Sequence, residues 1–145
     1  LLQRLEELFL QFGYFEDRAI SKNFAGAAGV ATMKGIMTKL REEGLTTLGG
    51  QKVVSIRDIQ TSTCYNPANP ADKKPVDLPK SNVLQFFLEN GTVVSARPSG
   101  TEPKIKFYIN SMVPPAASLE AAKLASAKLC DAIEAEINGI LDAAK

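Results

Sequence analysis

The sequence predicts an α+β domain in which a mainly antiparallel sheet of about four to five strands is covered on one face by helices. An Asn-Gly dipeptide joins two β-rich segments, 82–88 and 92–96, which is a strong short-range signal for a β-hairpin. Apolar and polar residues alternate at 105–109, as in a strand with one buried face. Two stretches with apolar residues at helical spacing, 30–43 and 118–143, lie before and after these strands. Helices packed against one face of a sheet would account for all three patterns.

Length and charge limit the classes of protein to which the chain can belong. With 145 residues it is expected to form one domain, with at most a short remnant of another. It begins with Leu1 rather than Met, and we expect it to be part of a longer protein. The net charge of +1 argues against a nucleic-acid-binding surface. No apolar run has the length of a membrane span and nothing resembles a signal peptide, so we expect no membrane partner and a cytoplasmic location.

Cysteine and histidine usage narrows the chemistry further. The two cysteines, Cys64 and Cys130, have the spacing of neither a metal site nor a disulfide framework. Cys130 lies among apolar helix residues and is expected to be buried, whereas Cys64 is expected in a polar loop. The chain has no histidine, the usual general base and a common metal ligand, which argues against a self-contained hydrolase or zinc enzyme.

The first half of the chain predicts a helix, a strand and a second helix. Residues 1–12 carry apolar side chains at helical spacing, and Gly13 is a plausible stop. Residues 14–24 form a weakly patterned strand. The second helix, near 30–43, ends at Gly44. Its expected core stripe consists of Val30, Met33, Ile36, Met37 and Leu40.

A Gly-Gly turn at 49–50 leads into a predicted strand at 51–59. Its alternation places Val54 and Ile56 on one face, with Ser55 and Arg57 on the other. Residues 60–82 follow, and we expect them to be irregular because prolines interrupt the segment. These prolines are Pro67, Pro70, Pro75 and Pro79. Both a functional loop and a tolerated surface excursion remain open for this segment.

The hairpin around Asn90 and Gly91 is expected to have a two-residue type I′ turn, which needs positive φ at both central residues. Pairing outward from that turn sets Phe86 opposite Ser95 and places Arg97 at the end of the second strand. Beyond a short loop, the next strand directs its apolar residues to one side. The final helix, from an N-cap at Ser118 to about 143, has a predicted apolar face. This face consists of Ala122, Leu129, Ile133, Ile137 and Leu141.

The loop at 97–104, Arg-Pro-Ser-Gly-Thr-Glu-Pro-Lys, has the chemistry of an anion-binding site. Arg97 offers a planar fork of donors suited to phosphate, while Ser99 and Thr101 add hydroxyl donors. Gly100 would let the backbone adopt positive φ and approach a ligand closely. Lys104 adds a second positive charge, and the two prolines limit the entropy lost on ordering.

Each residue of this loop also has an ordinary structural explanation. Arg97 could be a surface arginine, Lys104 and Lys106 a solvated face, and Ser99-Gly100 a plain turn. Glu102 could pair with a neighbouring cation or accept backbone hydrogen bonds. Two prolines, a glycine, two hydroxyls and two cations in eight residues are nevertheless more than a turn requires. The combination therefore favours phosphate binding.

The same octet, continuing as Ile-Lys-Phe-Tyr-Ile at 105–109, resembles the C-terminal phosphate-binding loop of the phosphoglucomutase/phosphomannomutase family, the α-D-phosphohexomutases. The resemblance extends over most of the chain, from the helix that ends at Gly13 to the final helix. It implies that 1–16 is a remnant helix or linker of a preceding domain and that 17–145 is a C-terminal domain with the TATA-box-binding-protein-like fold. Motifs for the phosphoserine, the Mg²⁺ loop and the sugar-reading loop do not occur here.

The resemblance also implies a function for the parent protein and for this chain. The intact parent would interconvert hexose 1-phosphate and hexose 6-phosphate, and this chain would bind the phosphate of the phosphosugar substrate through Arg97, Ser99, Gly100, Thr101 and Lys104. It would hold no catalytic residue and no metal, and it would be inactive alone. Mg²⁺ and the preceding domains of the same polypeptide would complete the enzyme.

Two other classes remain as alternatives. One is a stand-alone phospho-ligand-binding or regulatory module, in which the same loop binds a phosphate without a catalytic partner. The other is a nucleic-acid or protein interaction domain, which would need basic and aromatic residues repeated across an exposed sheet face. Lys104, Lys106 and Tyr108 are too few to favour it.

Overall fold

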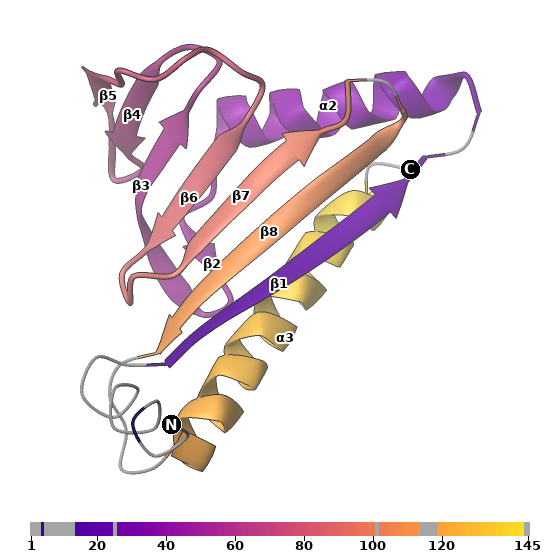
Figure 1. The fold of residues 1–145 in the computed structure, drawn as a ribbon. Helices are drawn as coiled ribbons and strands as arrows, with labels where there is room; N and C mark the ends of the chain where they lie inside the picture. Colours follow the sequence, from indigo (N-terminus) through magenta and orange to yellow (C-terminus); the bar gives the residue numbers. More distant parts are fainter. Residues whose placement is uncertain (1–3, 5–13, 25, 101, 114–118, 144–145) are drawn as a thin grey trace.

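The computed structural model describes residues 4, 14–24, 26–100, 102–113 and 119–143, and Figure 1 shows their arrangement. The described elements are β1 (Tyr14–Asn23), α2 (Ala28–Glu43), β2 (Thr47–Leu48), β3 (Gln51–Asp58), β4 (Thr63–Asn66), β5 (Asn69–Pro75), β6 (Leu84–Leu88), β7 (Val93–Pro98), β8 (Lys104–Val113) and α3 (Leu119–Ala143).

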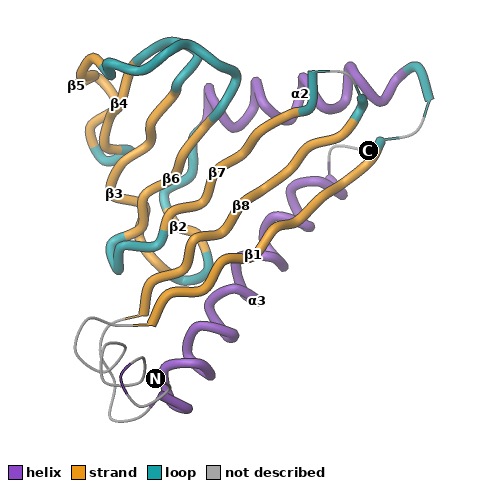
Figure 2. The backbone as a smooth tube through the Cα atoms, viewed as in Figure 1, coloured by secondary structure: helices purple, strands orange, loops and turns teal. Residues whose placement is uncertain are grey.

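The strands form one antiparallel sheet in the order β1-β8-β7-β6-β3-β4-β5, and β2 pairs with β3 beside this path. Figure 2 shows β1 and β5 at its two ends. The α+β class and the antiparallel sheet are therefore confirmed. The eight strands among the described residues exceed the four to five expected, because the sheet also takes in β2, β4 and β5.

Both helices lie against the same side of the sheet, which we call the core face (Figures 1 and 2). Ile105, Phe107 and Ile109 of β8 point to this side and are buried in one cluster with residues of α2 and α3. Residues in between, such as Lys106 and Tyr108, point to the other side, which we call the open face. This alternation follows the prediction for the strand at 105–109.

The predicted apolar stripes of both helices are almost entirely confirmed. The five residues predicted for α3 are all buried. In α2 the stripe from Met33 to Leu40 is buried, but Val30 is 42% exposed, so its assignment to the core was wrong. Val30 lies in the first turn of α2 and borders a pocket instead. The helix ends as predicted at Gly44, whose φ is 66° and whose N–H bonds to the Leu40 carbonyl at 3.1 Å.

The β6–β7 hairpin is present, but its predicted turn and register were wrong. Leu88 N–H donates to the Thr92 carbonyl at 2.9 Å, which makes the loop three residues long. Within this loop only Gly91 has positive φ (93°), whereas a type I′ turn needs positive φ at both central residues, so the turn is not type I′. Phe86 consequently pairs with Val94 rather than with Ser95. The observed register brings two buried side chains together on the core face, whereas the predicted one would oppose residues of opposite faces.

Strand β3 contains a bulge that the simple alternation missed. The register with β6 shifts between Val53 and Ser55, so Val53 and Ile56 both reach the core although they lie three residues apart. Val54, predicted to share a face with Ile56, is exposed instead. An extra residue in one strand reverses the alternation beyond it, which accounts for the error.

The segment 60–82 was predicted to be irregular and instead contains the hairpin β4–β5. Thr63 pairs with Pro75, and Asn66 pairs with Asn69. Prolines are tolerated here because β5 is the last strand of the sheet and needs hydrogen bonds on one side only. Pro67 falls in the turn between the two strands. Cys64, expected in a loop, is a half-buried residue of β4.

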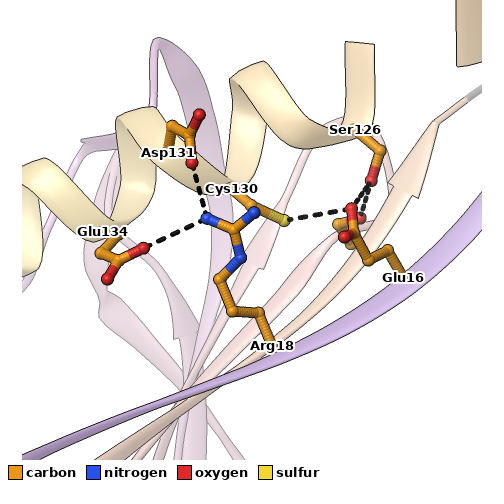
Figure 3. A network of polar contacts seen from close by, with 7 residues as sticks. Glu16, Arg18, Ser126, Cys130, Asp131 and Glu134 are labelled. Atoms are coloured by element: carbon orange, nitrogen blue, oxygen red, sulfur yellow. Dashed lines mark hydrogen bonds and ion pairs between the residues drawn. The ribbon is translucent and has the colours of Figure 1, made fainter. Parts of the chain in front are cut away.

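Strand β1 was weakly patterned in sequence because its helix-facing side carries Glu16 and Arg18 (Figure 3) as well as the buried Ile20. The Glu16 carboxylate accepts a hydrogen bond from the buried Ser126 hydroxyl at 2.6 Å, and Ser126 is 2.7 Å from the buried Ser111 hydroxyl. The Cys130 thiol donates to the same carboxylate at 3.9 Å. Cys130 is buried, as predicted, and burial raises the pKa of its thiol.

Ion pairs extend this contact between β1 and α3. Arg18 donates to Asp131 at 2.7 Å and to Glu134 at 3.1 Å, and the bond to Asp131 raises the pKa of the guanidinium (Figure 3). Lys22 lies 3.7 Å from Asp142. Polar side chains therefore join strand β1 to helix α3, in addition to the apolar residues that both elements contribute to the core.

Several predictions fall outside the described residues. These are the helix at 1–12, the stop at Gly13 and the cap at Ser118. The proposed domain boundary after residue 16 lies within β1, and the division of the chain stays a prediction. Within the described part of the chain, neither helix has the length and apolar character required to cross a membrane.

Candidate functional site

The loop 99–103 connects two neighbouring strands of the sheet, and its own hydrogen bonds close it. Ser99 N–H donates to the Lys104 carbonyl at 2.7 Å, and Lys104 N–H donates to the Glu102 carbonyl at 2.8 Å. Glu102 N–H reaches the Ser99 hydroxyl at 3.3 Å. Outside the loop, Phe24 N–H donates to the Pro103 carbonyl at 2.8 Å, which ties the loop to the chain after β1. The loop is therefore held at both ends by strands.

On the open face this loop borders a pocket of about 280 Å³, which we call the open-face pocket. Its lining residues are Arg97, Pro98, Ser99, Gly100, Lys106 and Tyr108. Three of the five predicted phosphate-binding residues are thus brought together: Arg97, Ser99 and Gly100. Thr101 lies outside the described residues.

Lys104 does not line the open-face pocket. It pairs with Asn23 of β1 and lies beyond the last paired residue of β7, Pro98. Lys106, which the sequence offered only as a supporting residue, occupies the pocket in its place. The signal that could have found it is the register of β7 and β8, since a residue two positions further along β8 points to the same face. A role for Lys104 in binding stays a prediction.

Arg97 and Lys106 are a cross-strand pair on the open face. Two like charges directly opposite each other on neighbouring strands are unfavourable. Neither cation forms an ion pair with any residue that the structure describes. An anion bound between them would offset the repulsion, and the guanidinium can donate two parallel hydrogen bonds to such an anion.

Gly100 does not have the backbone conformation that we predicted. Its φ is not positive, because the loop closes through the bonds of Ser99 and Lys104 without a left-handed residue there. A Cβ built on Gly100 would meet no atom within 4 Å. Glycine is therefore required here neither by φ nor by a neighbouring side chain.

On its other side the loop borders a second pocket, of about 380 Å³, which we call the helix-side pocket. It is lined by Val30, Met33, Lys34, Met37, Asn82, Pro98, Ser99, Gly100 and Glu102. Pro98, Ser99 and Gly100 line both pockets. The loop is thus a partition with a cationic pocket on one side and a mixed apolar and polar pocket on the other.

A chain of polar contacts holds Asn82 in the helix-side pocket. The Asp58 carboxylate is buried and accepts a hydrogen bond from Arg41 Nε at 2.8 Å. Arg41 Nη2 donates in turn to Asn82 Oδ1 at 2.9 Å. Because arginine can only donate, the amide oxygen of Asn82 must face Arg41, which leaves its NH₂ group as a donor elsewhere.

Metal ligands are not gathered in the described residues. Over this part of the chain, no three side chains from histidine, cysteine, aspartate and glutamate lie close enough together to hold an ion. The chemistry of both pockets comes instead from cations, hydroxyls, amides and apolar side chains.

Comparison with known proteins gives a consistent result. The family model for the phosphoglucomutase/phosphomannomutase C-terminal domain matches residues 23–127. The chain is 36% identical over 108 residues to a phosphoglucomutase of Staphylococcus saprophyticus, covering 74% of this chain and 19% of that protein. It is 37% identical over 110 residues to a phosphoglucomutase of Staphylococcus epidermidis, covering 76% and 20%. The chain thus spans about a fifth of the length of these relatives.

Among solved structures, one similar protein is the open form of parafusin, a phosphoglucomutase from Paramecium, with a TM-score of 0.49 and 20% identity. That alignment covers 95% of this chain and 21% of the Paramecium chain.

Proposed function

The chain belongs to the C-terminal domain of the phosphoglucomutase/phosphomannomutase family, and from this premise we propose that it binds the phosphate of a phosphosugar for a phosphohexomutase. The parent enzyme would move a phosphate intramolecularly between the 1- and 6-positions of a hexose. The observation that carries the proposal is the cross-strand couple of Arg97 and Lys106 beside the loop, two cations that form no ion pair with any described residue.

The proposed task of the domain is positioning and electrostatic stabilisation. The Arg97 fork and the Lys106 ammonium neutralise the phosphate that is not being transferred, and Ser99, which lines the same pocket, is a proposed further contact. Held in this way, the phosphosugar presents its other end to catalytic groups outside this domain. Thr101 and Lys104 remain proposed contacts by the family resemblance.

The remaining parts of the enzyme are proposed to lie in the preceding domains of the same polypeptide. The described residues offer no carboxylate cluster for Mg²⁺, so we assign its binding to those domains and derive no step from it. The isolated chain is proposed to have no mutase turnover. A cytoplasmic location fits such an enzyme of sugar phosphate metabolism.

An NMR titration of the chain with inorganic phosphate tests the proposal. A phosphate held by a few charge-assisted hydrogen bonds is expected to bind with a Kd on the order of millimolar. Shifts should centre on residues 97–100 and 106–108, and Arg97→Ala should weaken binding by about tenfold or more. Arg57→Ala removes an arginine of β3 that lies outside the pocket, stacked on Phe87, and should leave binding unchanged.

Two results would count against the proposal. Phosphate shifts that fall elsewhere, or that survive the loss of Arg97, would show that the loop is not the phosphate site. Mutase turnover by the chain alone, measured by conversion of glucose 1-phosphate to glucose 6-phosphate, would overturn the assignment of catalysis to other domains.

A further inference from the structure

We infer that Phe24 and Gly29 are positioning residues for the proposed phosphate site. Phe24 ties the end of the loop 99–103 to the core, and Gly29 lets helix α2 hold Phe24 in place. The inference rests on the proposed function, because it concerns the same anion site. Neither residue lines the open-face pocket, so both act on phosphate binding through the loop and not through contact with the anion.

Phe24 links the loop to the interior of the domain. It is 5% exposed and belongs to the hydrophobic core. Its N–H donates to the Pro103 carbonyl at 2.8 Å, one residue beyond Asn23 and Lys104, the last pair of the β1–β8 ladder. Because a closely packed side chain has little room to shift, this bond fixes the Pro103 carbonyl relative to the core.

The constraint reaches the pocket one residue further along the chain. The Lys104 carbonyl accepts a hydrogen bond from Ser99 N–H at 2.7 Å. Ser99 lines the open-face pocket together with Arg97. Fixing the backbone at Pro103 and Lys104 therefore fixes the backbone of Ser99 beside the proposed anion site, as a supporting contact does for a binding group.

Gly29 explains how closely α2 approaches Phe24. It is buried in the first turn of the helix, and its φ is not positive, so its backbone conformation does not call for glycine. A Cβ at this position would clash with the Phe24 carbonyl oxygen and would lie 2.9 Å from the carbonyl carbon. Alanine would favour the helix more than glycine does. The close approach to the Phe24 backbone is therefore the feature that requires glycine here.

Gly35 of the same helix provides a matched comparison. It is exposed, and a Cβ built on it would meet no atom within 4 Å. Gly29→Ala and Gly35→Ala make the same chemical change in one helix, but only Gly29→Ala displaces Phe24. The two variants therefore separate an effect transmitted through Phe24 from the effect of alanine on the helix itself.

The test measures phosphate affinity and the Phe24–Pro103 hydrogen bond in the same NMR samples of the 145-residue chain. The bond is detected as a scalar coupling between the Phe24 amide nitrogen and the Pro103 carbonyl carbon. Gly29→Ala should abolish this coupling and raise the Kd for inorganic phosphate by about three- to tenfold, because about one hydrogen bond no longer favours the binding conformation of the loop. Gly35→Ala should change neither the coupling nor the Kd.

A second variant removes the donor alone. Phe24→phenyllactic acid keeps the side chain and replaces the N–H with an ester oxygen, so it breaks the bond to Pro103 without altering α2. It should raise the Kd for phosphate by about the same factor as Gly29→Ala. The same replacement at Phe15, near the opposite end of β1, is its control and should leave the Kd unchanged. If Gly29→Ala does not fold, this pair of variants decides the question.

The outcomes separate this inference from the proposed function. If phosphate binds the open-face pocket equally tightly in the wild type and in the variants at Phe24 and Gly29, the inference is overturned and phosphate binding stands. The inference is likewise overturned if Gly35→Ala weakens binding as much as Gly29→Ala, or if Gly29→Ala weakens binding while the coupling survives. If phosphate does not shift the open-face pocket of the wild type, the proposed function itself fails, and this inference fails with it.

Discussion

The two faces of the sheet are built from alternate residues of the same strands but have opposite characters. In β8, Ile105, Phe107 and Ile109 are buried against the helices, while Lys106 and Tyr108 between them line a pocket. In β6, Phe86 is 1% exposed, whereas its neighbour Phe87 lies under the Arg57 guanidinium on the other side. The buried core and the cationic pocket are therefore separated by the pleat of the strand rather than by position along the chain.

The largest expected difference between the faces is at the two phenylalanines of β6. Phe86→Ala should lower the free energy of unfolding by about 3–5 kcal/mol, because it empties a fully buried site. Phe87→Ala should cost about 1–2 kcal/mol, since its ring is only half-buried. Urea unfolding followed by circular dichroism measures both. Equal losses would show that the open face contributes to stability as much as the core face does.

A smaller difference is expected in β1, where Glu16 and Asp17 are neighbouring carboxylates on opposite faces. Glu16→Ala should cost about 1–3 kcal/mol, because it leaves the buried hydroxyl of Ser126 without its acceptor. Asp17→Ala removes only an exposed contact to Asn110 and should cost less than about 0.5 kcal/mol. The same unfolding measurement serves. A larger loss for Asp17→Ala than for Glu16→Ala would contradict the structural role of the β1–α3 network.

The core face should also respond to alkaline pH through Cys130. Burial raises the pKa of its thiol, so the folded state retains the proton at pH values where the unfolded chain releases it. Its contribution to stability is therefore complete below the ordinary thiol pKa of about 8.5 and is lost as pH rises through the folded-state value. Urea unfolding between about pH 7.5 and 9.5, below the ordinary range of tyrosine, should show a steeper decline for wild type than for Cys130→Ala. If the free energy of unfolding falls equally with pH in both proteins, the Cys130 thiol is not the cause of the decline.

The smallest effect on stability is expected on the open face, where Lys106→Met should change the free energy of unfolding by less than about 0.5 kcal/mol. Relief of the repulsion from Arg97 opposes the loss of a partly buried side chain. Phosphate should stabilise the wild type by mass action and should stabilise Lys106→Met less. The gain is measured as the difference between the free energies of unfolding in phosphate and in sodium chloride of equal ionic strength. The same gain for both proteins would place the anion elsewhere.

Local sequence patterns predicted the elements whose own residues specify them. The apolar stripe of α2 ends at Gly44, and the stripe of α3 reaches the core, as their spacing indicated. The alternation of β8 correctly separated Ile105 from Lys106. Two positive-φ glycines, Gly49 and Gly50, form the predicted turn between β2 and β3. Each of these features depends on residues within a few positions of one another.

Most of the predictions that failed depended on a partner strand. The β6–β7 register follows from matching Phe86 to Val94 on the core face, which overrode the turn type that Asn90 and Gly91 favour in isolation. The bulge at Val54 and the prolines of β5 likewise depend on which strand lies alongside. No pattern within a single strand carries that information.

The sequence by itself determined the fold class, the family and the chemical character of the loop at 97–104, because these depend on residue types and their local order. Only the tertiary structure placed Lys106, rather than Lys104, opposite Arg97, since the pairing of β7 with β8 decides which lysine lies beside the arginine. It also brought Lys34, Asn82 and Glu102 together from three separate segments. Contacts between distant segments form where burial of the core aligns the strands, and the polar residues on the opposite face take their positions from that alignment.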